Sequence, residues 1–283
     1  LGLCEKKEEE RMYRLVNSEG DRLSGLIIDV FGNKVVVQSR GLWCEIHREK
    51  IEEAIQRVFN RDDPEIKNNE MEIIWQRVNK HLEKDGWINA TDNTGTAIST
   101  DDDTVVDDDS GRIVCSENGI LYNVNPMLGQ KTGFYMDQRE NRQLIQKLAK
   151  NKTVLDMYCY TGGFSVNALK GGAKQVIAVD SSEYAINTAN KNLILNNINS
   201  NSDNDNDNEN ANTNKIVFIK DDAITYMKKL VSEGTQFDMV ILDPPKLAPN
   251  SKNLKNYGDK IYKKYRMINT LGMKLVKSGG IML

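Results

Sequence analysis

Residues 154–164 read Val-Leu-Asp-Met-Tyr-Cys-Tyr-Thr-Gly-Gly-Phe, and this stretch is the clearest indication of the fold class. Apolar residues lead into Asp156, and the pair Gly162-Gly163 opens a segment with helical spacing. A strand that runs through an acid and glycines into a helix is typical of a βα unit in a parallel sheet. The glycines let the backbone approach a ligand closely, and the following helix N-terminus favours an anionic group such as a carboxylate.

Strands and helices alternate from this stretch to the end of the chain. The pattern predicts strands at 154–158, 175–180, 216–220, 237–243 and from 281, with helices at 164–169, 183–197, 223–231 and 260–276. Such alternation is typical of an α/β domain with a doubly wound parallel sheet and right-handed crossovers.

Four of these strands end in an acid. In an open parallel sheet, ligands bind beyond the carboxyl ends of the strands. One such acid is a common helix cap, but four in successive units indicate a binding site. A carboxylate after the second strand can accept both ribose hydroxyls of an adenosine, and one after the third can accept from the adenine amino group. The acids are Asp156, Asp180, Asp222 (or Asp221) and Asp243, with Ala223 following the third.

The ligand that fits these acids best is S-adenosylmethionine, an adenosine that carries an amino acid. The chain contains neither Gly-x-Gly-x-x-Gly nor Gly-Lys-Ser/Thr, which argues against a dinucleotide fold and a P-loop. After the fourth strand comes Asp243-Pro244-Pro245-Lys246. Tandem prolines stiffen the backbone, so this loop suits a flat substrate base held beside a methyl donor.

The first part of the chain has a different pattern. Strands are predicted at 26–30, 35–38 and 71–77, a helix at 49–59, and a hairpin at 112–116 and 120–124. This order predicts a small α+β domain over residues 1–125, followed by the α/β domain over 126–283. Residues 88–110 are polar and acidic and are expected to form a disordered loop, whereas the Asn/Asp-rich run 199–214 is interpreted as a surface insertion without function.

Charge and composition narrow the function further. The 283 residues include 38 Lys+Arg and 41 Asp+Glu, but segments 92–110 and 199–214 hold 11 of the acids and no base. The rest of the chain therefore has a surplus of bases, which suits a polyanionic partner such as RNA, although a mixed solvated surface explains it equally well. No apolar run could cross a bilayer, and with 4 Cys and 2 His neither a disulfide scaffold nor a metal site is expected.

The two ends of the sequence look cut. The chain starts at Leu1 and stops at Leu283, within a predicted strand, so truncation at both ends is expected. No targeting signal is visible. A cytoplasmic location is expected, with an organelle left open because the true N-terminus is inferred to be missing.

Three stretches together resemble the large-subunit ribosomal RNA methyltransferases of the cytosine-C5 type. They are 129–139 (Gly-Gln-Lys-Thr-Gly-Phe-Tyr-Met-Asp-Gln-Arg), 160–164 (Tyr-Thr-Gly-Gly-Phe) and 243–246 (Asp-Pro-Pro-Lys). Residues 13–21 and 26–31 are similar to that family's entry into its middle domain. The family combines a PUA domain, a strand-strand-helix-strand-strand (EEHEE) domain and a class I, Rossmann-like methyltransferase domain. The resemblance covers nearly the whole chain outside the two acidic insertions.

The resemblance implies a role for each matching residue. Lys131, Thr132, Phe134, Asp137, Gln138 and Arg139 would line the cofactor and substrate pocket. The methionine part of S-adenosylmethionine would lie against Asp156, Thr161, Gly162, Gly163 and Phe164, the ribose against Asp180 and Ser181, and the adenine against Asp222 and Ala223. Methyl transfer would take place at Asp243, Pro244, Pro245 and Lys246. Core packing is the alternative for Phe134 and Phe164, and a solvated helix position for Arg139 and Arg142; a pocket role is favoured only for Arg139.

Methylation of cytosine at carbon 5 requires a thiolate that adds to carbon 6. In the family this cysteine follows the fifth strand, so it is expected beyond Leu283; Cys159 is interpreted as structural. Guanine-N7 methylation of rRNA is therefore an alternative, as is a non-catalytic RNA-binding or ribosome-assembly protein that keeps the fold. Adenine-N6 chemistry is disfavoured by Lys246, and a nicotinamide oxidoreductase by the missing glycine fingerprint. A homodimer is left open.

Overall fold

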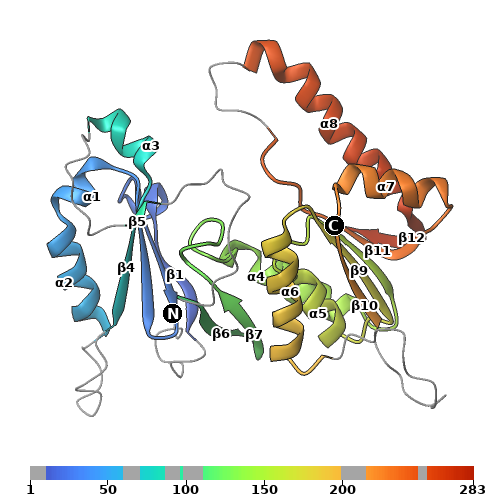
Figure 1. The fold of residues 1–283 in the computed structure, drawn as a ribbon, viewed down its shortest axis with the longest axis horizontal. Coiled ribbons are helices and arrows are strands. Elements are labelled where there is room, and N and C mark those ends of the chain that lie inside the picture. Colours follow the sequence, from blue (N-terminus) through green and yellow to red (C-terminus); the bar gives the residue numbers. More distant parts are fainter. Residues whose placement is uncertain (1–10, 60–70, 87–95, 98–110, 199–214, 248–253) are drawn as a thin grey trace. The chain divides into compact units, whose positions relative to one another are not determined.

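The computed structural model describes residues 11–59, 71–86, 96–97, 111–198, 215–247 and 254–283. The chain divides into two compact units, Leu1–Arg139 and Glu140–Leu283. The expected α/β fold with a doubly wound parallel sheet is confirmed for the second unit (Figure 1). None of the described helices has the length and apolar composition needed to cross a bilayer. The segment 1–10, most of 88–110 and all of 199–214 lie outside the described residues.

The first unit is built on a five-stranded mixed sheet in the order β1-β2-β3-β4-β5, with the hairpin β6–β7 as a separate two-stranded sheet. The pairs β1–β2 and β2–β3 are antiparallel, whereas β3–β4 and β4–β5 are parallel. The strands are β1 Met12–Asn17, β2 Leu26–Phe31, β3 Lys34–Ser39, β4 Glu72–Arg77, β5 Thr96–Ala97, β6 Ile113–Glu117 and β7 Ile120–Val124. The helices are η2 Ser18–Asp21, α1 Leu42–Ile46, α2 Arg48–Phe59, α3 Asn79–Leu82, η3 Glu83–Asp85 and η4 Met136–Gln138.

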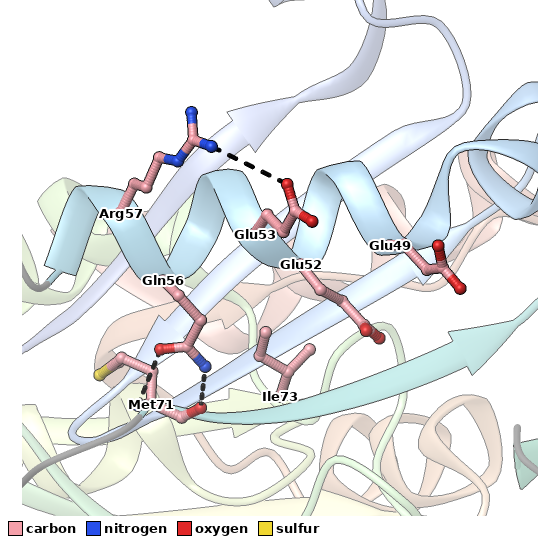
Figure 2. A pocket seen from close by; sticks show the side chains of 7 residues that line it. All are labelled: Glu49, Glu52, Glu53, Gln56, Arg57, Met71 and Ile73. Atoms are coloured by element: carbon pink, nitrogen blue, oxygen red, sulfur yellow. Dashed lines mark hydrogen bonds and ion pairs between the residues drawn. The ribbon is translucent and has the colours of Figure 1, made fainter.

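An apolar core holds α2 against this sheet. Ile55 of α2 is buried together with Ile28, Val37 and Trp75 from the strands. Figure 2 shows how the end of the helix is fastened: the Gln56 amide donates to the Met71 carbonyl at 2.8 Å and accepts from the Met71 amide at 3.3 Å. These two hydrogen bonds fix Met71, the residue directly before β4, to the end of α2. Periodic apolar positions therefore explain why this helix and these strands were predictable.

The second unit has a five-stranded sheet in the order β10-β9-β8-β11-β12, and every pair is parallel. The chain moves outward from β8 to β10 and returns to the other side of β8 with β11. Such a reversal creates a crevice at the carboxyl ends of the strands, between β8 and β11. The strands are β8 Thr153–Met157, β9 Gln175–Asp180, β10 Lys215–Lys220, β11 Phe237–Leu242 and β12 Val276–Met282. The helices are α4 Arg139–Leu148, α5 Gly163–Lys170, α6 Glu183–Leu195, α7 Ala223–Ser232 and α8 Leu254–Leu275.

Helices α7 and α8 pack together over one face of this sheet, and α5 and α6 pack on β8, β9 and β10 (Figure 1). The core beneath α7 and α8 includes Leu155 and Val240 from the strands, Met227 from α7, and Ile268 and Leu275 from α8. All five side chains are at most 1 % exposed. This packing fixes the strand ends that carry the acids.

Several elements differ from the expectation. The strand β1 and the short helix α1 were not predicted, and β5 pairs with β4 inside the segment expected to be disordered. The last strand begins at Val276 rather than 281, with an irregular register between the pairs Phe237–Val276 and Met239–Ile281. The units divide after Arg139 rather than after Asn125, because the segment after β7 is tied to the first sheet. The Gln76 amide, for example, donates to the Pro126 carbonyl, and Thr132 donates to Asp29.

Candidate functional site

The carboxyl edge of the second sheet collects the four acids that the sequence placed at strand ends. Asp156 lies in β8, Asp180 ends β9, Asp222 precedes α7 after β10, and Asp243 directly follows β11. The charges of Asp243 and Asp180 both act on Asp156 and raise its pKa. The acids of β8, β9 and β11 therefore lie close together, as the parallel sheet requires.

Asp156 lies beneath the edge. Its side chain is fully buried, one carboxylate oxygen accepts from the Ser165 hydroxyl of α5 at 2.6 Å, and Oδ1 has no hydrogen-bond partner among the described residues. Burial, assisted by the charges of Asp243 and Asp180, raises its pKa to about 7. A carboxyl in this position braces the start of α5 and is protonated over much of the neutral range.

The loop from β8 to α5 has a strained backbone. Tyr158, Tyr160 and Gly162 have φ values of +63°, +48° and +75°. Asp180 holds the middle of this loop: its carboxylate accepts from the Tyr160 amide at 2.9 Å and from the Ser182 amide at 2.9 Å. Each oxygen keeps a further lone pair, because a carboxylate has about four acceptor positions. Strained backbone that the surrounding structure holds in place is typical of ligand sites.

Gly162 lies close to side chains of α6 and β10. A Cβ atom there would lie 3.0 Å from the Ala189 methyl group and 3.0 Å from the Phe218 ring. Gly162 also precedes α5, and no side chain caps that helix start. Thr161 is buried, and its carbonyl accepts from the Asn192 amide of α6 at 2.9 Å. Phe164 is half-buried, so it does not belong to the buried core.

Asp222 caps α7. Its carboxylate accepts from the amide of Thr225 at 2.8 Å and from the hydroxyl at 2.7 Å. These hydrogen bonds, with smaller contributions from the charges of Lys264 and Lys228, lower its pKa. Tyr158 lies nearby, since burial and then the charge of Asp222 raise the pKa of its phenol to about 12. An aromatic ring and a carboxylate thus stand beside Ala223 at this end of the edge.

The loop after β11 is exposed at Asp243, Pro245 and Lys246. It is anchored at its far end, where the Leu247 amide donates to the Tyr265 hydroxyl of α8 at 3.0 Å. The loop is therefore held by α8 at the carboxyl edge of the sheet.

The predicted site residues of segment 131–139 all belong to the first unit. The Thr132 hydroxyl donates to buried Asp29 at 2.5 Å, and the Phe134 ring is buried 4.8 Å from the Tyr122 ring. Lys131 pairs with exposed Asp137 at 3.1 Å, and the Arg139 guanidinium pairs with Glu117 at 3.1 Å. Gln138 forms part of η4. Within the first unit, Phe134 is therefore a buried residue that packs on Tyr122, as the core-packing alternative expects.

The structure also bears on the interpretations of Arg142 and Cys159. The interpretation of Arg142 as a solvated helix residue is wrong: it is 3 % exposed, and its Cδ atom lies 3.3 Å from the Cβ position of Gly163. Cys159 is buried, and burial raises the pKa of its thiol well above the ordinary value. Such a thiol is inert, which supports its structural interpretation. Over the described segments, no group of three or more His, Cys, Asp or Glu residues could hold a metal ion.

Sequence reasoning missed Tyr158, Ser165 and Asn192 as parts of this edge. Ser165 and Asn192 lie on the inward faces of α5 and α6, so helical periodicity would have placed them toward the loop. The sequence does not indicate that Tyr158 belongs to this edge, because its position depends on a positive φ value in a residue other than glycine.

Replacing Gly162 by alanine tests the tight fit of the loop. We expect a loss of about 2 kcal/mol in the free energy of unfolding, from the left-handed backbone and the two close contacts together. Gly234→Ala is the matched control, since Gly234 has φ +70° and nothing within 4 Å of its Cβ position. It should lose only about 1 kcal/mol. Unfolding followed by far-UV circular dichroism gives the free energy of unfolding of both variants. Equal losses in the two variants would show that the neighbours of Gly162 move aside at no cost.

Comparisons with known proteins agree with this geometry. The model of the S-adenosylmethionine-dependent methyltransferase family matches residues 109–283. A protein of Cronobacter sakazakii named "Ribosomal RNA large subunit methyltransferase I" is 30% identical over 98% of this chain and 61% of its own length. A protein of the same name from Aeromonas salmonicida is 34% identical over 96% of this chain and 59% of its own length. The chain thus spans about three fifths of these relatives.

Solved structures share the fold. SMU.776, which is assigned as a methyltransferase and was crystallised with SAH, has a TM-score of 0.68 at 23% identity, covering 99% of this chain and 62% of its own. A methyltransferase from Agrobacterium tumefaciens has a TM-score of 0.54 at 17% identity, covering 91% and 69%. At these identities the likeness shows the fold alone. Since the family model matches more than half of its length, the chain belongs to the S-adenosylmethionine-dependent methyltransferase family.

Proposed function

We propose that this protein transfers a methyl group from S-adenosylmethionine to large-subunit ribosomal RNA, at carbon 5 of a cytosine. The observation that carries the proposal is the cluster of acids at the carboxyl edge, which ends in the exposed Asp-Pro-Pro-Lys loop. The name of the relatives supports the RNA substrate. The resemblance of the three quoted motifs supports the cytosine.

The edge residues fit the cofactor in chemistry and shape. Asp180 keeps lone pairs for the ribose hydroxyls beside exposed Ser181, and Asp222 and Ala223 stand where an adenine ring would lie against Tyr158. The methionine part would lie against Thr161, Gly162, Gly163 and Phe164, where the backbone leaves no room for a larger side chain at Gly162. Fully buried Asp156 positions the start of α5 beside the proposed methionine subsite. We further propose that residues 131–139 of the first unit contribute to the substrate side.

The transfer itself would take place at Asp243, Pro244, Pro245 and Lys246. When bound, S-adenosylmethionine supplies an electrophilic methyl group. The rigid proline pair holds a flat base, and exposed Asp243 can accept a hydrogen bond from an exocyclic amino group. Carbon 5 also needs a thiolate, and Cys159 is unsuited because burial raises its pKa. The proposed cytosine chemistry therefore requires a thiol other than that of Cys159.

Nucleoside mass spectrometry tests the substrate and the position together. The protein is incubated with isotopically labelled S-adenosylmethionine and large-subunit rRNA that lacks the modification, and the RNA is then digested. Labelled 5-methylcytidine is expected. Labelled 7-methylguanosine would instead identify the guanine-N7 alternative, and absence of any labelled nucleoside would favour a non-catalytic RNA-binding protein.

A further inference from the structure

The first unit contains a polar pocket of about 340 Å³ that the proposed methyl transfer does not use. We call it the arginine pocket. Its lining includes three basic side chains and one acidic one, together with two amides. These are Arg14, Arg40, Lys131, Glu19, Asn17 and Gln38.

Buried groups hold Arg14 in place at the pocket. Its guanidinium donates to both carboxylate oxygens of Asp29, at 2.8 Å and 2.9 Å, and to the Asn17 side-chain oxygen at 3.2 Å. Asp29 is fully buried and also accepts from Thr132. A planar guanidinium fixed in this way keeps its remaining N–H groups in a defined direction.

Arg40 is fixed by a second buried group. Its Nε donates at 2.8 Å to Gln38, a side chain that is 4 % exposed. The Gln38 amide in turn donates to the Gln76 side chain and to the Lys131 carbonyl, both at 3.4 Å. Burying such a polar chain in a small domain costs stability, and it gains conformational specificity instead.

Arg40 has weaker charge compensation than the other two basic side chains at the arginine pocket. Arg14 is paired with Asp29, and Lys131 with Asp137, but within the described segments no carboxylate forms an ion pair with Arg40. Burial and the charge of Arg14 lower the pKa of Arg40, and the charge of Glu19, which also lines the pocket, offsets only part of this effect. An incoming anion would add to this partial compensation by Glu19.

We propose that the arginine pocket binds a backbone phosphate of the substrate RNA. Arginine forks match the geometry of phosphate oxygens, and the exposed amide of Asn17 can hydrogen-bond the adjoining sugar. The volume is sufficient for a phosphate with its sugar. The identity of the anion rests on the RNA substrate proposed above. The phosphate recognition itself rests on the geometry of the pocket.

The test is the binding of a fluorescent single-stranded oligoribonucleotide to the whole chain, followed by anisotropy at several salt concentrations. Arg40→Gln should weaken binding about tenfold and lower the salt slope by about one, because one phosphate contact is lost. Inorganic pyrophosphate should compete with the RNA at the wild-type pocket. Arg57→Gln is the matched control, since Arg57 is exposed on α2 and forms an ion pair with Glu53, outside the lining of the arginine pocket. It should bind RNA like the wild type.

Equal RNA affinity of Arg40→Gln and the wild type, with the same salt slope, would overturn the proposal. An equal loss of RNA affinity in Arg57→Gln would also overturn it, as would a wild-type chain that binds no RNA. Direct binding of pyrophosphate to a wild-type chain that binds no RNA would show a site for free phosphate compounds instead. S-adenosylhomocysteine titrated into the same samples reports the second unit separately. Unchanged cofactor affinity in Arg40→Gln shows a folded second unit, so failure of the pocket and failure of the proposed methyl transfer can be told apart.

Discussion

Asp180→Ala is expected to lower the affinity for S-adenosylhomocysteine by about 100-fold, because two charge-assisted hydrogen bonds to the ribose are lost. The effect has a second origin in the protein itself. Asp180 also accepts from the Tyr160 and Ser182 amides, so its removal frees the strained loop that faces the ligand. Isothermal titration calorimetry measures the affinity directly.

The control for this variant is an acid at the opposite edge of the same sheet. Asp238, near the start of β11, accepts from Thr153 at 2.8 Å and pairs with Lys277 at 2.8 Å. Asp238→Ala should therefore lower the stability of the second unit and leave cofactor affinity unchanged. Equal affinities of Asp180→Ala and the wild type would contradict the assignment of the ribose subsite.

The stability of the second unit should fall between about pH 4 and pH 7 because of Asp156. In the unfolded chain this carboxyl ionises near its ordinary pKa of 3.8, whereas burial raises the pKa in the folded protein to about 7. Between these values the folded state binds more protons than the unfolded state, so the free energy of unfolding decreases as the pH rises and levels off above about 7. A shift of this size corresponds to about 4 kcal/mol at most.

Asp156→Asn is the comparison that isolates this carboxyl. The amide keeps the shape and an oxygen that can accept from Ser165, but it does not ionise. Urea unfolding by circular dichroism at pH 5 and pH 8 should show a smaller decrease for the variant. Tryptophan fluorescence provides an internal reference, because Trp43, Trp75 and Trp87 all belong to the first unit. The same pH dependence in both proteins would mean that Asp156 is ionised when folded.

The second unit was predictable because its signals are local. Apolar runs such as 237–242 mark buried parallel strands, and the acids follow from the rule that ligands bind at carboxyl ends. The burial of Arg142 was not predictable in the same way. A basic residue on a short helix normally faces water, and only the close approach of Gly163 to α4 shows that it does not.

The first unit shows what long-range contacts add. Asp29 reads as a polar interruption in an apolar strand, yet it binds Arg14 fifteen residues before it and Thr132 far along the chain. No spacing rule relates these positions, because the contact depends on how the segment after β7 returns to the sheet. For the same reason, the position of the unit boundary could not be read from composition.

The strand order also predicts where the protein tolerates insertions and deletions. In a parallel sheet, each connection from a helix to the next strand enters that strand at its amino end, away from the acids at the carboxyl ends. The segment between the end of α6 at Leu195 and the start of β10 at Lys215 is such a connection. Residues can be inserted there without changing the relative positions of the residues at the carboxyl edge. Length variation among orthologues should therefore concentrate in this connection and spare the strand-to-helix turns.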